Sequence, residues 1–205
     1  MSSPIHTRIA DALARLSALQ RYEENQQSRN AGLSPLQARA LVTIRRRSSV
    51  RLGALANELL VTEGTLSAAV SALEEKGLVV KRSDPAEHRA VNLELTRKGT
   101  TASRHAERWA GDQIEPAMSE LDEGEASTLL KSLLKLLRAF ERQGAIAEAR
   151  MCFSCRHFVP KGGSGTRRHY CGLLEQAIGE IDLQVECPDH EPASPEQLEA
   201  TRGRI

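Results

Sequence analysis

The chain has 205 residues, of which 40% are apolar and 27% are charged, a mixture typical of a globular protein with room for one ordinary domain and an appendage. Aromatic residues make up only 3%, so the core must consist mainly of Leu, Ala and Val, which favours a mostly helical fold. The formal net charge of +1 excludes a generally basic protein, so any affinity for DNA must come from local clusters of cations. No apolar run approaches the roughly 20 residues that span a bilayer, and the amino terminus is polar where a signal peptide is apolar. We therefore expect a cytoplasmic protein without a membrane partner.

Residues 4–29 predict a first amphipathic helix. Its charged residues fall on one face, and large aliphatic residues recur at helical spacing on the other. These residues are Ile5, Ile9, Leu13, Leu16 and Leu19.

A second helix has a defined start in GLSPLQARAL. Ser34 as N-cap, Pro35 at the first helical position and Gln37 two residues later form a capping box. The helix ends in three arginines at residues 45–47. They face a phosphate backbone, or they are solvated cations favoured by the dipole of the helix end; the residues alone leave both interpretations open.

Residues 50–95 predict a winged helix. Two short helices share one apolar seam, which is a helix-turn-helix pattern, with Thr62 as N-cap of the second helix and Gly77 as its left-handed end. A β-hairpin is predicted next, because apolar and polar residues alternate in its second strand. It consists of the strand LVVKR, the polar loop DPAEH and the strand RAVNLEL. The seam residues are Leu52, Leu55, Ala56, Leu59, Leu66, Val70 and Leu73.

The pattern LxxLAxxLxVxxGTLSxxVxxLExKGLVxR, followed by an acidic hairpin tip, an Arg and LELTxKG, resembles the MarR family of bacterial winged-helix transcription regulators. The resemblance covers roughly residues 5–145. It implies a homodimer that reads a pseudo-palindromic operator in double-stranded DNA, with a small-molecule effector bound between the dimerisation helices and the DNA-binding lobe. It also implies that the first helix joins the C-terminal helices in the dimer interface, whereas the residues alone allow packing within one chain equally well.

The predicted recognition helix presents small side chains to DNA: Thr65, Ser67, Ala68 and Ser71, with Thr62 at its start. Hydroxyl groups can hydrogen-bond base edges or phosphates, but these residues cannot make the bidentate contact of Arg with guanine. Many members of the family carry Arg at the position of Ala68. Recognition of DNA shape therefore fits this helix better than direct readout.

The hairpin supplies cations at Lys81, Arg82 and Arg89. The family commonly has Asp-x-x-Asp-Arg-Arg at the tip, where this chain has Asp84, Glu87, His88 and Arg89. By this resemblance Arg89 reaches the minor groove and an acidic neighbour holds it in place. The alternative is a salt bridge across a surface turn. The predicted DNA-binding residues are Thr62, Thr65, Ser67, Ala68, Ser71, Lys81, Arg82 and Arg89.

Downstream, Thr96 caps a long helical region over residues 97–121, which we expect Pro116 to bend. The next helix, ASTLLKSLLKLLRAFERQ, carries a very wide apolar face. A face of this width needs more than one neighbour, and a partner subunit is the expected cover. Its apolar residues are Leu129, Leu130, Leu133, Leu134, Leu136, Leu137 and Phe140.

All four cysteines lie in the last quarter of the chain, at Cys152, Cys155, Cys171 and Cys187. The first two form a C-x-x-C pair, and fifteen residues separate each of the following cysteines. Such clustering in a cytosolic chain indicates a metal or redox site before a disulfide framework. Four thiolates satisfy a structural zinc site, which is the predicted cofactor; an iron–sulfur cluster is the alternative, because Cys-Pro also occurs in ferredoxin ligand runs.

The sequence therefore predicts a mainly α protein with a small β-wing, divided into three parts. These are a winged-helix DNA-binding and dimerisation domain at 1–148, a Cys-rich metal-binding module at 149–192 and a flexible tail at 193–205. We expect a DNA-binding transcription regulator, modulated by the metal or redox site, and not an enzyme. The alternatives are a thiol-redox enzyme, which only the C-x-x-C pair supports, and a winged helix that contacts proteins alone.

Overall fold

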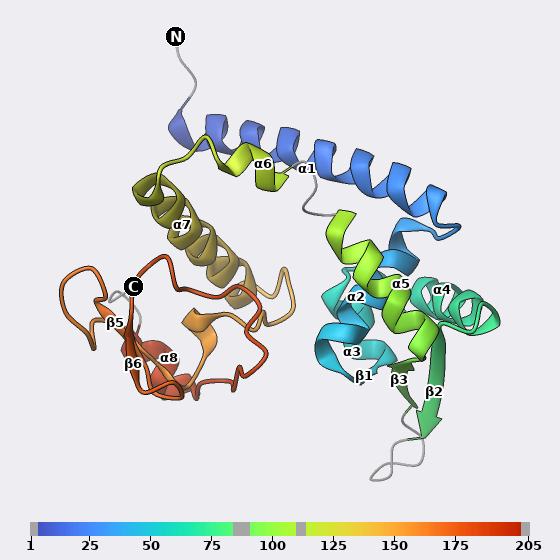
Figure 1. Cartoon of the computed structure of the whole chain (residues 1–205). Coiled ribbons are helices and arrows are strands. Elements are labelled where there is room, and N and C mark those ends of the chain that lie inside the picture. The colour runs from blue at the N-terminus through green and yellow to red at the C-terminus, as the bar shows by residue number, and fades with distance from the viewer. Residues whose placement is uncertain (1–3, 84–90, 110–113, 202–205) are drawn as a thin grey trace. The chain divides into compact units, whose positions relative to one another are not determined.

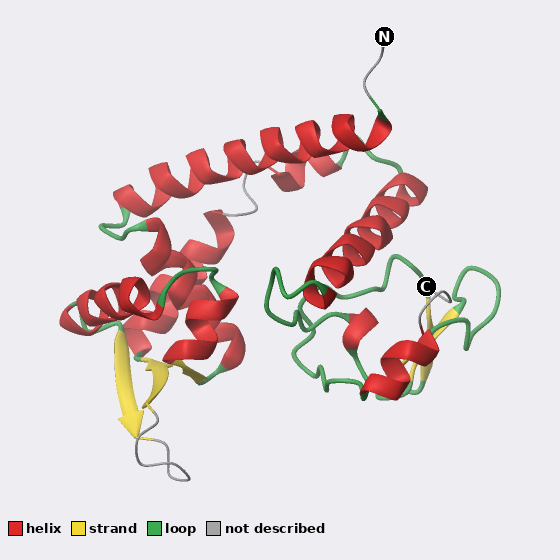
Figure 2. Ribbon diagram, turned by 180° about the vertical axis from the view of Figure 1, so that it is seen from behind, coloured by secondary structure: helices red, strands yellow, loops and turns green. Residues whose placement is uncertain are grey.

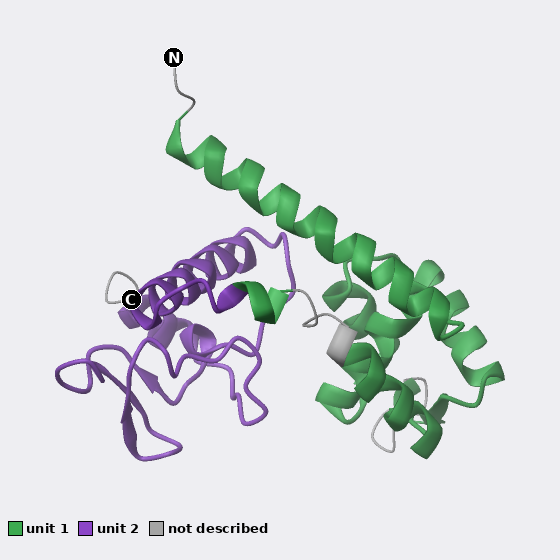
Figure 3. Ribbon diagram, turned by 45° about the horizontal axis from the view of Figure 1, so that its top comes forward, with its two compact units in different colours: residues 1–117 green, residues 118–205 purple. Residues whose placement is uncertain are grey.

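The protein is described from a computed structural model that covers residues 4–83, 91–109 and 114–201. The chain forms two compact units, residues 1–117 and residues 118–205 (Figure 3). Among the described residues, no helix is both long and apolar enough to cross a membrane.

The first unit consists of helices and one small antiparallel sheet, in the strand order β1-β3-β2 (Figure 1). The short helix α6 (Ile114–Met118) runs across the boundary between the units. The other elements are α1 (Ile5–Asn30), α2 (Pro35–Arg47), β1 (Val50–Arg51), α3 (Leu52–Glu58), α4 (Glu63–Glu75), β2 (Val79–Ser83), β3 (Val91–Leu95) and α5 (Arg97–Trp109).

The predicted helix caps are confirmed. Gln37 N donates to Ser34 Oγ at 3.2 Å and Ser34 N donates to Gln37 Oε1 at 3.1 Å, which is the reciprocal capping box at the start of α2. Thr62 accepts from the backbone N–H of Thr65 at the start of α4. Gly77 closes that helix with φ +68°, a conformation that favours glycine.

The core of the first unit is the predicted helix-turn-helix seam, extended by α2 and the wing. Leu55, Leu66, Val70 and Leu73 are fully buried together with Leu93 of the wing. The predicted hairpin pairs in register, with Val79 opposite Leu95. A third strand, β1, pairs with the other edge of β3; its two residues are too few to show a strand pattern in the sequence.

The exit from the wing depends on a glycine. A Cβ atom at Gly99 would lie 1.9 Å from the carbonyl oxygen of Leu78, so no other residue fits without movement of the backbone. The same carbonyl accepts from Thr96 N at 3.1 Å, and Thr96 Oγ1 caps the helix by accepting from Gly99 N at 2.9 Å. The strand end and the start of α5 are thus held together at one carbonyl group.

The helical region expected over residues 97–121 is described in two parts, α5 up to Trp109 and α6 from Ile114. The stretch between them, residues 110–113, lies outside the described residues. Pro116 lies within α6, so the predicted bend stays a prediction.

The second unit places one long helix beside a small antiparallel sheet in the order β4-β5-β6 (Figure 2). An antiparallel sheet of this kind lacks the βαβ context of a thioredoxin-like enzyme. The elements are α7 (Glu123–Arg142), the 3-10 turn η1 (Cys152–Ser154), β4 (Phe158–Val159), β5 (His169–Cys171), β6 (Gln176–Ile178) and α8 (Pro195–Thr201).

The second unit begins at Met118, upstream of the expected boundary between residues 148 and 149. Leu134 of α7 is fully buried in a cluster with Met151, Phe153 and Phe158, so the last long helix packs with the Cys-rich segment. The expected tail from residue 193 also contains a helix, α8. Its first turn has a capping box, in which Gln197 N donates to Ser194 Oγ and Ser194 N donates to Gln197 Oε1.

Candidate nucleic-acid interface and cysteine cluster

The first turn of α4 presents hydroxyl groups that are already ordered. Thr62 and Thr65 are exposed, their Oγ1 atoms are 2.8 Å apart, and Thr65 N donates to Thr62 Oγ1 at 3.2 Å. Ala68 is exposed one turn later, while Ser67 and Ser71 are half-buried. The outer face of α4 is therefore narrow and lined by small groups, which permits close approach of the helix backbone to a groove.

The wing cations are paired within the protein. Lys81 Nζ lies 2.5 Å from Glu74 Oε2 of α4, and Arg82 Nε lies 2.9 Å from Glu94 Oε2 of the neighbouring strand. Neither pair follows from the sequence pattern, because each joins residues of two different elements. Arg89, the cation at the hairpin tip, lies outside the described residues.

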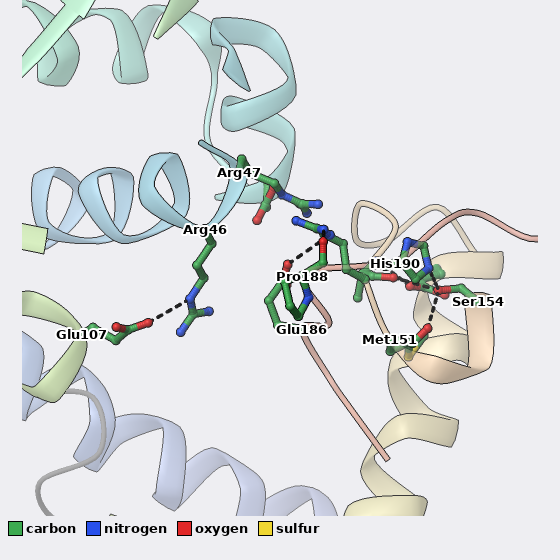
Figure 4. A network of polar contacts seen from close by, with 12 residues as sticks. Arg46, Arg47, Glu107, Met151, Ser154, Glu186, Pro188 and His190 are labelled. Atoms are coloured by element: carbon green, nitrogen blue, oxygen red, sulfur yellow. Dashed lines mark hydrogen bonds and ion pairs between the residues drawn. The ribbon is translucent and has the colours of Figure 1, made fainter. Parts of the chain in front are cut away.

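The three arginines at the end of α2 serve tertiary structure in a way that neither sequence interpretation included. Arg45 and Arg46 both form ion pairs with Glu107 of α5, the latter at 3.2 Å (Figure 4). Arg47 Nη2 pairs with Glu58 of α3 at 3.0 Å. Glu107 is some sixty residues away in sequence, so no local pattern could have revealed these contacts.

A pocket of about 670 Å³ opens between the end of α1, the loop before α2 and one face of α5. Leu33 and Leu78 supply apolar lining, and Lys76, Lys98 and His105 supply groups that can carry positive charge. Lys76 Nζ donates to Gly32 O at 2.7 Å, and Lys98 Nζ donates to Lys76 O at 2.9 Å, so both ammonium groups are held in place.

Two helices carry exposed apolar stripes. The predicted stripe of α1 is at the surface along its whole length, with Ile5 54% and Leu16 52% exposed. On α7 the wide apolar face is split into two parallel seams. The inner seam, Leu130, Leu134 and Leu137, packs against the Cys-rich segment, whereas the outer seam, Leu129, Leu133, Leu136 and Phe140, is half-buried at Leu133 and exposed at the other three positions.

The C-x-x-C pair lies in the turn η1. Cys155 N donates to Cys152 O at 3.1 Å, which closes the turn. Cys152 N donates to Gln184 O at 3.1 Å and Cys187 N donates to Arg150 O at 2.8 Å. These two bonds place the segment that carries Cys187 beside the turn.

Cys171 reaches the same region through the sheet. It is paired with Phe158 across β4 and β5, and the next residue, Gly172, donates from its N–H to His157 O at 2.8 Å. The loop between these strands needs a glycine, since a Cβ at Gly163 would lie 2.1 Å from Arg167 O. This loop, which contains the segment KGGSGT at residues 161–166, joins β4 to the strand that carries Cys171.

The four thiols are reduced and half-buried. Burial raises the pKa of the Cys152 thiol to about 11, and the nearby thiols of Cys187, Cys155 and Cys171 add to the shift, while a hydrogen bond from the Gln184 backbone opposes it. The thiol of Cys152 thus lies close enough to the other three cysteines to feel their charge. Among residues 4–83, 91–109 and 114–201, no group of three or more His, Cys, Asp or Glu side chains has the geometry of a formed metal site.

Part of the chain is similar to known proteins in sequence and in fold. Residues 31–90 match the sequence profile of the MarR family. FabT of Streptococcus pneumoniae, solved in complex with DNA, is 26% identical with a TM-score of 0.58, and the match covers 67% of this chain and 99% of that one. No curated protein sequence matches the chain.

Two further solved structures share the fold. BldR of Sulfolobus solfataricus is 24% identical with a TM-score of 0.56, over 65% of this chain and 95% of that one. Wild-type MarR of E. coli is 22% identical with a TM-score of 0.55, over 67% and 98%. Residues 31–90 therefore resemble the MarR family in sequence, and the chain shares a winged-helix fold with these solved structures.

Proposed function

We propose that the protein is a homodimeric transcription regulator that binds a pseudo-palindromic site in double-stranded DNA through α4 and the wing. The observation that carries this proposal is the exposed, small-residue face at the N-terminal half of α4, fixed beside a β-wing by a buried core. The likeness to FabT, whose structure contains DNA, supports it.

The chemistry of α4 suits close contact with the backbone and edges of DNA. The positive end of the helix dipole and the paired hydroxyls of Thr62 and Thr65 lie at the same exposed turn. Ala68 lets the helix approach the major groove and can contact a thymine methyl group. Specificity then comes in large part from the shape of the site.

The ion pairs of the wing affect the free energy of binding to DNA, because they must be broken before Lys81 and Arg82 can contact phosphate. To face phosphate, Lys81 and Arg82 exchange a carboxylate partner of the protein for a phosphate oxygen. Both pairs are partly solvent-exposed, and exposed ion pairs stabilise a fold by only about 0–1 kcal/mol, so the exchange costs little. Each cation that reaches phosphate also releases a counterion from DNA.

Dimerisation is the second part of the proposal. The stripe of α1 and the outer seam of α7 are apolar surfaces that a second copy of the chain would remove from water. The outer-seam residues recur at intervals of four, three and four, as in helices that pack lengthwise against each other. A dimer then presents two copies of α4 to two half-sites.

The pocket beside α5 is the proposed effector site. Its lysines and histidine favour a small anionic molecule with an apolar body. It is lined by both the end of α1 and the domain that carries α4, so an occupant contacts the proposed dimerisation helix and the DNA-binding part at once.

The test is binding of the full chain to duplex DNA from the region upstream of its own gene, over a range of salt concentrations. We expect affinity to fall steeply with salt, and Arg89→Ala to weaken binding and reduce the salt slope by about one unit. Ala68→Glu, on the exposed face of α4, should abolish binding without unfolding the protein. Binding that ignores salt, or that survives Ala68→Glu, would favour a winged helix that contacts proteins only.

A further inference from the structure

The C-terminal unit has too little core to hold its loops in place by apolar packing alone. Its three strands have two or three residues each, and its buried apolar cluster consists of six residues, including Leu134, Met151 and Phe153. Small folds of this kind need a cross-link from disulfides or metal. All four cysteines are free thiols, so no disulfide supplies it.

The cysteines are arranged in a manner that suits thiolate ligands. Gln184 N lies 3.2 Å from Cys152 Sγ and donates an N–H···S hydrogen bond, an interaction that stabilises negative charge on sulfur. Cys152 and Cys155 lie at the two ends of one closed turn. Strand pairing brings Cys171 to this turn, and the backbone bond from Cys187 to Arg150 brings the fourth thiol.

Two of the nearby histidines, His157 and His190, form hydrogen bonds with other side chains. His190 Nε2 lies 3.0 Å from Ser154 Oγ (Figure 4), and His157 Nε2 lies 3.1 Å from Glu191 Oε1. The ring of His169 is buried and tilted by 40° against Phe158, with centroids 5.2 Å apart; Lys161 N donates to its Nδ1 at 3.4 Å, and its Nε2 has no hydrogen-bond partner among the described residues. The four cysteines are therefore the candidate ligands, and His169 Nε2 is the one buried imidazole nitrogen left without a partner in this part of the structure.

We propose that Cys152, Cys155, Cys171 and Cys187 bind one Zn²⁺ ion in a tetrahedral site that cross-links the C-terminal unit. This site goes beyond DNA binding and does not depend on it. Each thiol that binds loses its proton to solvent, so a complete site releases four protons and carries a net charge of −2. Zn²⁺ binds thiolates at about 2.3 Å, so a loaded site holds the four sulfur atoms in tetrahedral geometry around one ion.

The first measurement uses the wild-type full chain, purified without oxygen and without chelators. We expect one zinc per chain and four thiols that react slowly with a thiol reagent. Titration with an organomercurial should release the zinc in proportion to the thiols modified. Iron with acid-labile sulfide would overturn the zinc assignment, and four rapidly reacting thiols without metal would overturn the site itself.

Variants then test the ligand set. Cys171→Ser is expected to lose most of its zinc, whereas His157→Gln and His190→Gln, matched controls in the same unit, should keep one zinc per chain. If Cys171→Ser fails to fold, the wild-type protein reconstituted with Co²⁺ decides, because four thiolates give intense tetrahedral d–d bands and sulfur-to-cobalt charge transfer. Weak octahedral bands, or loss of metal in the histidine variants with retention in Cys171→Ser, would contradict the proposal.

Discussion

Lys81 of the wing and Glu74 of α4 form an ion pair with Nζ and Oε2 2.5 Å apart. The pair joins the last turn of the proposed recognition helix to the first strand of the wing. In this arrangement the ammonium group of Lys81 faces a carboxylate of the protein instead of solvent or DNA.

We predict that Glu74→Gln tightens binding to duplex DNA. The change frees Lys81 for phosphate, and an exposed pair is worth about 0–1 kcal/mol, so affinity should rise by about twofold to fivefold and the salt slope should steepen. Glu75→Gln is the matched control, because it removes the same charge from the next, exposed position of α4. Equal gains in the two variants would show that net charge acts and the pair does not.

The second prediction separates the two seams of α7. Leu129→Glu together with Leu136→Glu should produce folded monomers in sedimentation, because a charge cannot be buried unpaired in an apolar interface. Ser132→Glu, at an exposed polar position of the same helix, should leave the dimer intact. A dimer that persists in the double variant would assign the outer seam another role.

Leu134→Ala on the inner seam should act differently. It creates a cavity in the core of the C-terminal unit and is expected to lower its free energy of unfolding by about 2–5 kcal/mol. Dimerisation through the outer seam should persist under conditions where the unit stays folded.

The third prediction concerns Gly99. Gly99→Ala should destabilise the first unit by more than about 1 kcal/mol, since the new methyl group overlaps the carbonyl of Leu78 and the backbone must shift. At Gly64 of α4 a Cβ meets no heavy atom within 4 Å, and Gly64→Ala should leave stability equal or raise it by about 0.5 kcal/mol. Chemical denaturation of the two variants measures the contrast, and equal stabilities would show that the exit from the wing is adaptable.

The fourth prediction is an acid dependence in the C-terminal unit. A hydrogen bond from Lys131 lowers the pKa of Glu180 below its ordinary value of 4.5, and the charges of Lys131 and Arg168 act in the same direction, whereas burial opposes them. A carboxyl group with a lower pKa in the folded state stabilises the fold above pH 4.5, and this contribution is lost as pH falls through the folded pKa. Glu180→Gln should remove this part of the acid sensitivity, while Glu175→Gln, exposed in the same unit, should retain it.

Removal of the metal provides the fifth prediction. A strong chelator should lower the unfolding temperature of the C-terminal unit and leave the transition of the first unit in place, because each unit has its own buried cluster. If the metal also regulates, affinity for DNA should change by about fivefold or more on removal, as is typical of coupled sites. Equal affinity with and without metal would assign it a structural role alone.

Local signals in the sequence are enough to predict the helices and strands of the winged helix and their order. Capping residues such as Ser34 and Thr62, the left-handed Gly77, and the alternation in the wing act within a few residues, so their patterns predict the winged helix directly. The helix-turn-helix seam could also be predicted, because 3.6-residue periodicity identifies the buried face of a helix without knowledge of what packs against it. Most of the proposed DNA-binding face follows from this same reading.

The tertiary structure decided which partners those faces take. The apolar periodicity of α7 identified a wide stripe but not that Leu134 turns toward Met151 and Phe153, nor that the outer seam stays exposed. Ion pairs such as Lys81 with Glu74 and Arg46 with Glu107 likewise join residues of different elements, and charge in a sequence does not name its partner. The pattern of buried residues in a helix or strand is local in the sequence. The formation of ion pairs and packing contacts depends instead on which distant residues the tertiary structure brings together.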